Sequence, residues 1–139
     1  MPYRTFHDGR YVFIAWDRPA VGDIDGLVAD LAKVRKLVAE PLVIFSVIPA
    51  DGEPPAAAFR KQIVGRWEEI LPKGETVHAV LVGSGIGASL NRAVLNTIRM
   101  FVRGRGIGKV YSAVATALRE ERVPDSITAE RLRTAGILR

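Results

Sequence analysis

The 139-residue chain contains no cysteine, which excludes disulfide bonds and thiolate metal sites. Its only histidines, His7 and His78, make a weak case for a transition-metal site. No apolar run approaches the roughly 18 to 20 residues that a membrane-spanning helix needs, and the N-terminus lacks the basic start and apolar segment of a secretory signal. We therefore expect a cytoplasmic protein without a metal or other cofactor.

Acidic residues are scarce in the C-terminal part of the chain. The net charge is +5, and residues 89–139 carry ten basic and four acidic residues, whereas residues 1–88 carry ten and eleven. Such asymmetry can mark an anionic partner such as nucleic acid or lipid, but we favour the other interpretation, a basic, solvated surface that promotes solubility.

Segments with the apolar spacing of strands alternate with segments that have the apolar spacing of helices. Period-two or continuous apolar runs predict strands at residues 3–7, 10–16, 42–48, 76–82 and 109–114. Helical spacing predicts helices at residues 24–38, 55–71, 86–101 and 116–122. A further helical segment at 124–139, with Gly136 as its stop, extends the domain at its C-terminus.

This order, β-β-α-β-α-β-α-β-α, predicts one α/β domain over residues 1–139, with a single mixed, largely parallel sheet covered by helices. The first two strands are joined by Asp8-Gly9, which suits a type I′ hairpin turn. Asp23 is expected to cap the first helix and Pro55 to lie in the first turn of the second.

The third helix has a long apolar stripe, which predicts the face that packs on the sheet. Leu95 and Val102 lie beside this stripe and could take part in self-association. The residues expected to face the sheet are Ile86, Leu90, Val94, Ile98 and Phe101.

A glycine-rich turn, Gly83-Ser84-Gly85-Ile86-Gly87-Ala88, follows a predicted strand and opens this helix. It fits G-x-G-x-x-A, but the next strand lacks the acidic residue of a dinucleotide site, and no Gly-Lys-Ser/Thr follows as in a P-loop. Ser84 lacks the flanking glycines of a nucleophile elbow. The turn is thus either a tight connection or a contact for an anion or small ligand.

No catalytic pair emerges from the sequence. His78 is expected to be a packed or edge histidine rather than a general base, and no two carboxylates stand out as an acid and base. We therefore expect that the protein is not an enzyme. Arg92, Arg99 and Arg103 are spaced to share one helical face, which would suit phosphates, a solvated surface or a salt-bridged interface.

The succession of elements over roughly residues 3–122 resembles the STAS domain, the fold of bacterial anti-sigma-factor antagonists. Members of that family carry a phosphorylatable serine or threonine after the central strand. In this chain the corresponding segment reads Pro-Ala-Asp-Gly-Glu-Pro-Pro at residues 49–55 and has no hydroxyl. The resemblance therefore implies a fold and a regulatory role without the phospho-switch.

We accordingly expect a non-enzymatic interaction module that docks on a protein partner. The docking edge would comprise Asp51 and Glu53 with the adjacent Gly83–Gly87 turn, because loops after parallel strands emerge at one end of the sheet. The alternative is a small-ligand or anion-binding protein that uses the Gly83–Gly87 turn and Arg92. The interaction residues expected under these two hypotheses are Asp51, Glu53, Gly83, Ser84, Gly85, Gly87 and Arg92.

Overall fold

The computed structural model describes residues 2–49, 54–82 and 86–138, with no side chains described for residues 86–88. Its strands are β1 (Tyr3–Asp8), β2 (Tyr11–Trp16), β3 (Val43–Pro49), β4 (Thr76–Val82) and β5 (Ile107–Tyr111). Its helices are α1 (Asp23–Leu37), α2 (Ala57–Gly65), α3 (Trp67–Ile70), α4 (Ile86–Phe101), α5 (Val114–Glu120) and α6 (Ala129–Thr134).

The five strands form one mixed sheet in the order β1-β2-β3-β4-β5. β1 and β2 pair antiparallel, and all later neighbours pair parallel. The predicted α/β class, with a largely parallel sheet opened by a hairpin, is confirmed.

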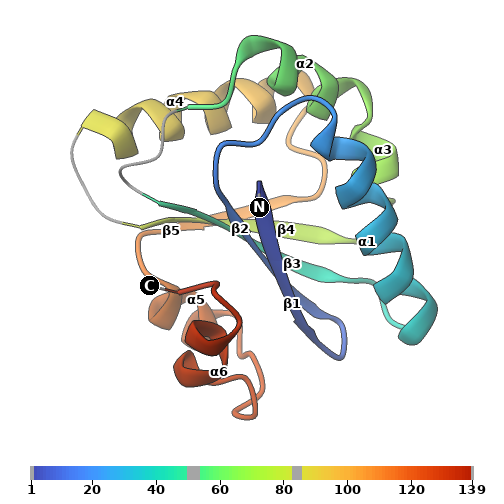
Figure 1. Ribbon diagram of the computed structural model, residues 1–139, viewed down its shortest axis with the longest axis vertical. Coiled ribbons are helices and arrows are strands. Elements are labelled where there is room, and N and C mark those ends of the chain that lie inside the picture. Colours follow the sequence, from blue (N-terminus) through green and yellow to red (C-terminus); the bar gives the residue numbers. More distant parts are fainter. Residues whose placement is uncertain (1, 50–53, 83–85, 139) are drawn as a thin grey trace.

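Helices cover both faces of the sheet (Figure 1). Helices α1 to α4 lie over one face, because crossovers between sequential parallel strands share one hand. Helices α5 and α6 lie against the other face.

Each face has its own hydrophobic core. Under α1 to α3, Val12, Ile44 and Leu27 belong to a buried cluster. On the opposite face, Phe13 stacks on Phe45 with ring centroids 4.8 Å apart. Alternate residues of β2 and β3 thus point to opposite layers, as the pleat requires.

The hairpin turn and the first helix cap differ from the prediction. The turn residues are Gly9 and Arg10, because Asp8 still pairs with Tyr11. Only Gly9 has a positive φ, +57°, whereas a type I′ turn needs two such residues. The N-cap of α1 is Gly22, and the carboxylate of Asp23 instead accepts a hydrogen bond from the Ala20 N–H at 2.6 Å.

The helix expected at 55–71 is two helices. α2 ends at Gly65 and α3 begins at Trp67, because Arg66 leaves helical geometry with φ −111° and ψ 21°. Pro55 therefore precedes α2 by two residues instead of lying in its first turn. The elements expected at 109–114 and 116–122 each begin two residues earlier, as β5 and α5.

The C-terminal segment packs into the core of the α5–α6 face. Ile127, Leu132 and Ile137 are buried there, and Arg131 donates to Asp8 at 2.8 Å. Gly136 follows α6 with φ +79°, which confirms it as the residue that stops the helix.

A buried ion pair ties the end of α1 to the start of β4. Arg35 Nε and an Arg35 terminal nitrogen donate to the two oxygens of Glu75 at 2.8 and 2.7 Å. The same guanidinium donates to the Ile70 carbonyl at 2.8 Å, and the Glu75 side chain is only 7% exposed. This fork of three hydrogen bonds fixes the segment between α3 and β4.

Candidate functional site

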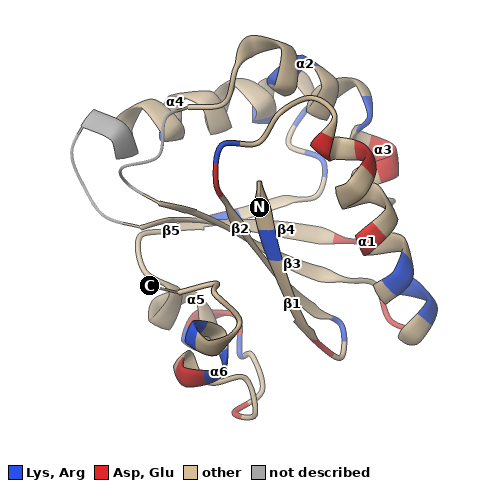
Figure 2. Ribbon diagram, viewed as in Figure 1, with Lys and Arg blue, Asp and Glu red and all other residues tan. Residues whose placement is uncertain are grey.

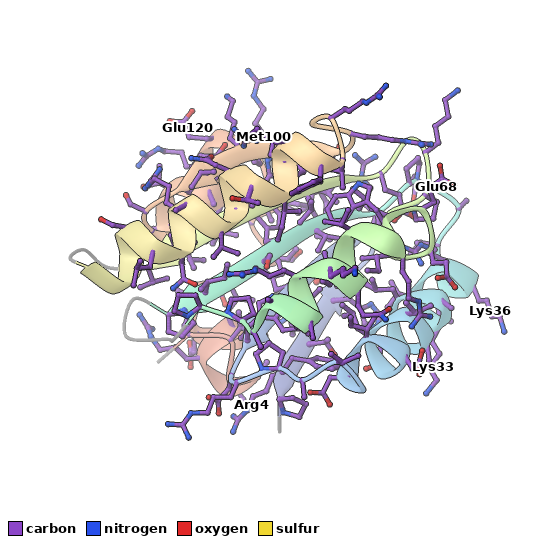
Figure 3. The ribbon with its side chains drawn as sticks, turned by 90° about the horizontal axis from the view of Figure 1, so that it is seen from above. Arg4, Lys33, Lys36, Glu68, Met100 and Glu120 are labelled. Atoms are coloured by element: carbon purple, nitrogen blue, oxygen red, sulfur yellow. The ribbon has the colours of Figure 1, made fainter. Side chains whose placement is uncertain are left out.

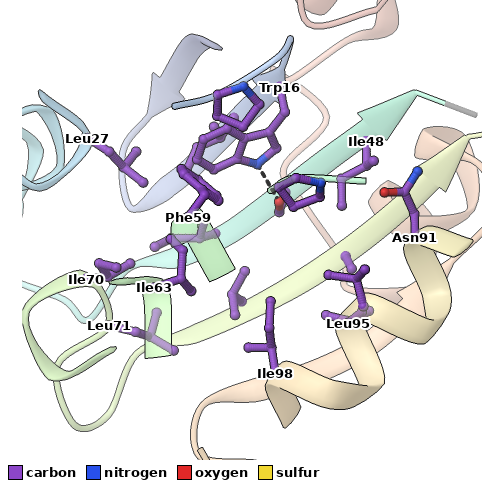
Figure 4. A pocket seen from close by; sticks show the side chains of 18 of the residues that line it. Trp16, Leu27, Ile48, Phe59, Ile63, Ile70, Leu71, Asn91, Leu95 and Ile98 are labelled. Carbon is purple, nitrogen blue, oxygen red and sulfur yellow. Dashed lines mark hydrogen bonds between the residues drawn. The ribbon is translucent and has the colours of Figure 1, made fainter. Parts of the chain in front are cut away.

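An apolar cavity of about 380 Å³ lies between the sheet and the helices that cover it (Figure 4). Residues of β2, β3, β4, α2, α3 and α4 line it. Its volume falls within the range of small-molecule sites, about 300 to 1,000 Å³. It is also more than twice the volume of an engineered apolar cavity of about 150 Å³ that binds benzene.

The floor of the cavity is hollow because two small side chains lie next to each other on the sheet. Ser46 of β3 is in register with Ala79 of β4, and Ile14 of β2 continues the same row. All three residues line the cavity. In strands otherwise rich in bulky residues, this small pair leaves space that neighbouring side chains do not fill.

The walls are aromatic on one side and aliphatic on the other. Phe59 of α2 meets Trp16 edge-on, with ring centroids 5.8 Å apart. From α4, Val94, Leu95 and Ile98 line the opposite wall, and Figure 4 shows Leu95 and Ile98 projecting from α4 toward the sheet. The indole Nε1–H of Trp16 donates to Ser46 Oγ at 2.7 Å, so this polar pair is satisfied within the lining.

The charged lining residues and Asn91 lie at one end of the cavity, whereas Ser46 lies in the floor. Asp17 and Arg18 follow β2, and Asn91 lies in the first half of α4, the helix that follows the carboxyl end of β4. At the opposite end, Ile107 begins β5 and Leu71 directly follows α3. The cavity is therefore amphipathic along its length, with its polar end at the carboxyl ends of the strands.

Most of the interaction residues expected from the sequence lie outside the described residues. Asp51, Glu53, Gly83, Ser84 and Gly85 belong to this group. Gly87 lies in the first turn of α4, and Arg92 is exposed on the same helix. The expected interaction residues that the structure describes therefore both belong to α4, the helix that forms one wall of the cavity.

The order of the strands in the sheet does not provide the kind of ligand site that is usual at the strand ends of open α/β sheets. The strands follow one another without a reversal of order, so the sheet has no topological switch point of the kind that opens a crevice beyond its strand ends. The hollow lies between the layers instead.

The face of α4 that packs inward is only partly the one expected: Val94 and Ile98 line the cavity as expected, but the two ends of the predicted stripe do not face inward. Leu90 and Phe101, expected inside, are 49% and 71% exposed. Asn91 is 4% exposed, and Leu95 lines the cavity. The spacing of apolar residues misled the prediction because α4 has apolar side chains on more than one side.

The expected arginine face of α4 is also wrong. The helix ends at Phe101, so Arg103 lies in the following turn, with φ +55°. Arg99 donates to the Gly108 carbonyl at 3.2 Å, and Arg105 pairs with Glu68 at 2.8 Å.

His78 is a packed histidine with both ring nitrogens engaged, on the face opposite the cavity. Its Nδ1 accepts from the Lys109 N–H at 3.0 Å, and its Nε2 lies 3.1 Å from Glu121. The other oxygen of Glu121 accepts from the Tyr111 hydroxyl. Burial, followed by this hydrogen bond, raises the pKa of Tyr111 to about 12. The arrangement leaves no ring nitrogen of His78 free for proton transfer to a substrate.

Gly108 is required beside this histidine. A Cβ at Gly108 would overlap the His78 imidazole, so we expect Gly108→Ala to lower the free energy of unfolding by about 1 to 3 kcal/mol. Urea titration measures the change. The matched control is Gly65→Ala at the end of α2, where a Cβ meets nothing within 4 Å. An equal loss in both variants would contradict the steric explanation.

The pKa of His78 is lowered mainly by burial, with Lys109 adding to the shift and Glu121 opposing it. The unfolded chain therefore binds a proton more readily than the folded one. We expect the free energy of unfolding to fall as the pH drops below about 6.5, by at most about 1.4 kcal/mol per pH unit. His78→Gln should reduce this slope, as measured by urea unfolding at pH 5 to 7.5. An unchanged slope would assign the pH dependence to other groups.

The residues that form the cavity were not identified as site residues from the sequence. Ser46 and Ala79 are small residues in otherwise bulky apolar strands, and their pairing was the available signal. It becomes informative only when the strand register is known.

Comparisons with protein-family models, with curated proteins and with solved structures found no match to this chain. Among residues 2–49, 54–82 and 86–138, no helix combines the length and apolar character needed to cross a bilayer. The same residues contain no cluster of three or more histidine, aspartate or glutamate side chains that could hold a metal ion.

Proposed function

We propose that the protein is a non-enzymatic binding protein whose cavity holds one small amphipathic molecule. The observation that carries this proposal is the largely apolar cavity of about 380 Å³, at one end of which the described lining residues include Asp17, Arg18 and Asn91. Apolar pockets with a few convergent polar groups are the usual form of small-molecule sites.

The lining defines the chemical class of the ligand. The aliphatic and aromatic walls suit a hydrocarbon chain or a small ring system. Arg18 lies at the polar end and is exposed, so it can meet an anionic head group such as a carboxylate. The ligand class is therefore a medium-chain monocarboxylate or a molecule of similar shape.

Thermal unfolding with a series of straight-chain molecules tests this function. A ligand that binds only the folded state raises the melting temperature with its concentration. We expect decanoate to raise it more than hexanoate, and acetate to leave it unchanged, because chain length sets the apolar area buried. Equal effects of acetate and decanoate would contradict binding in the cavity.

The polar end is tested by comparing decanoate with decanol. Arg18→Gln should remove the preference for decanoate and leave decanol binding unchanged. Arg119→Gln is the matched control, because Arg119 is exposed on α5, on the other face of the sheet. If both variants keep the preference, Arg18 does not contact the head group.

Docking on a protein partner, the function expected from the sequence, stays a prediction, as do the STAS-like regulatory role and the cytoplasmic location. The docking prediction is tested by partner capture with charge-reversal variants of Asp51 and Glu53. Unchanged binding by these variants would count against that docking edge.

A further inference from the structure

The outer surface of α4 exposes apolar side chains. Met100 and Phe101 are 78% and 71% exposed, and Leu90 is 49% exposed. Leu90 and Phe101 are eleven residues apart, about three helical turns, so they lie on the same side of the helix. Figure 3 labels Met100 at the surface of α4. Exposed apolar side chains gathered on one element indicate an interaction surface.

The charged side chains of α4 and of the turn after it are all positive, and Arg105 of that turn pairs with Glu68 of α3. Between Glu75 and Glu120 the sequence has no acidic residue and six basic ones. Figure 2 accordingly shows no acidic segment on α4. Within the described part of the chain, Arg92, Arg103 and Lys109 form no ion pair, and all three are exposed.

We propose that α4 and the turn after it dock on the surface of an anionic phospholipid bilayer. Apolar side chains on one helix would enter the interface between head groups and acyl chains, while the neighbouring arginines would meet lipid phosphates. The helix has 16 residues, too few to span a bilayer of ~30 Å, so it would lie along the surface. This surface is distinct from the cavity, and the proposal does not depend on a ligand there.

A lipid surface fits these residues better than a second copy of the chain. Two copies meeting through α4 would bring like charges together, which is unfavourable. Three apolar side chains spread over about 16 Å of helix are also too sparse for the dry core of a protein interface. A fluid bilayer accepts such side chains individually.

Co-sedimentation with vesicles tests the proposal. The probes are vesicles of phosphatidylcholine alone and vesicles of phosphatidylcholine with about 30% phosphatidylglycerol. Both are assayed at physiological ionic strength, about 0.15 M. We expect wild-type protein to bind only the anionic vesicles and to dissociate at high salt. Arg92→Gln/Arg103→Gln should weaken this partitioning roughly tenfold to thirtyfold. Met100→Ser/Phe101→Ser should weaken it at least about tenfold, because it removes apolar area.

Matched variants control for charge and exposure. Arg119→Gln/Arg133→Gln removes two exposed arginines from α5 and α6, and Leu37→Ser removes a leucine that is 71% exposed on α1. Both should bind as wild type does, and the melting temperature checks that every variant is folded. No vesicle binding by wild type overturns the proposal, as does equal weakening by test and control variants. Concentration-dependent dimerisation lost only in Met100→Ser/Phe101→Ser would instead assign the surface to self-association.

Discussion

Replacing Arg35 with methionine is expected to lower the free energy of unfolding by roughly 3 kcal/mol, the largest stability effect among these variants. The change removes three hydrogen bonds from the guanidinium, two to Glu75 and one to the Ile70 carbonyl. It leaves a carboxylate whose side chain is 7% exposed without its cation. An unpaired charge in that position costs far more than the pair itself contributes. Urea unfolding of the wild type and Arg35→Met measures the difference.

A second variant separates the unpaired charge from lost packing. Arg35→Met/Glu75→Leu replaces both charges with apolar side chains and should recover at least half of the lost stability. Arg66→Met is the surface control, because its partners Asp25 and Glu69 are 80% and 57% exposed. That variant should lose about 1 kcal/mol or less. If it lost as much as Arg35→Met, burial would not explain the effect.

Filling the cavity from its floor is expected to abolish ligand binding without loss of stability. Ala79 is 4% exposed, lies in the middle of β4 and lines the cavity. In Ala79→Phe the ring would occupy the space between the sheet and α4. Decanoate binding should weaken at least about a hundredfold, since the alkyl chain loses most of its apolar contacts. The free energy of unfolding should stay unchanged or rise by about 0.5 to 2 kcal/mol, as for other cavity-filling changes.

The control for this variant is Ala29→Phe, which adds the same ring at an exposed position of α1. Calorimetric titration with decanoate should give wild-type affinity for Ala29→Phe and no measurable heat for Ala79→Phe. If Ala79→Phe instead bound decanoate as wild type does, the ligand would lie elsewhere. A large loss of stability in Ala79→Phe would show that the cavity is too narrow for the ring.

The sheet could be predicted from the sequence because its signals are local. Apolar runs such as Val43–Ile48 mark buried strands, and a glycine after Asp8 marks the hairpin. The boundary of α2 and α3 could not be predicted, since the apolar spacing continues through Arg66 while its backbone does not. Periodicity reports which side chains can be buried, and tertiary packing decides where the helix breaks.

The candidate site could not be predicted because it arises between elements. Ser46 and Ala79 are 33 positions apart in the sequence and become neighbours only through the register of β3 and β4. Part of the inner face of α4 was misassigned for a related reason, although Val94 and Ile98 were placed on it correctly. Leu90 and Phe101 fit an apolar stripe as well as Leu95 does, and exposure rather than spacing distinguishes them.

The most direct test of the central claim uses the tryptophans of the chain. It has two, Trp16 and Trp67, and both line the cavity. The apolar fluorophore N-phenyl-1-naphthylamine should quench their emission saturably, with one probe bound per chain and displacement by decanoate. Quenching that does not saturate, or that decanoate leaves unchanged, would contradict a ligand site in this cavity.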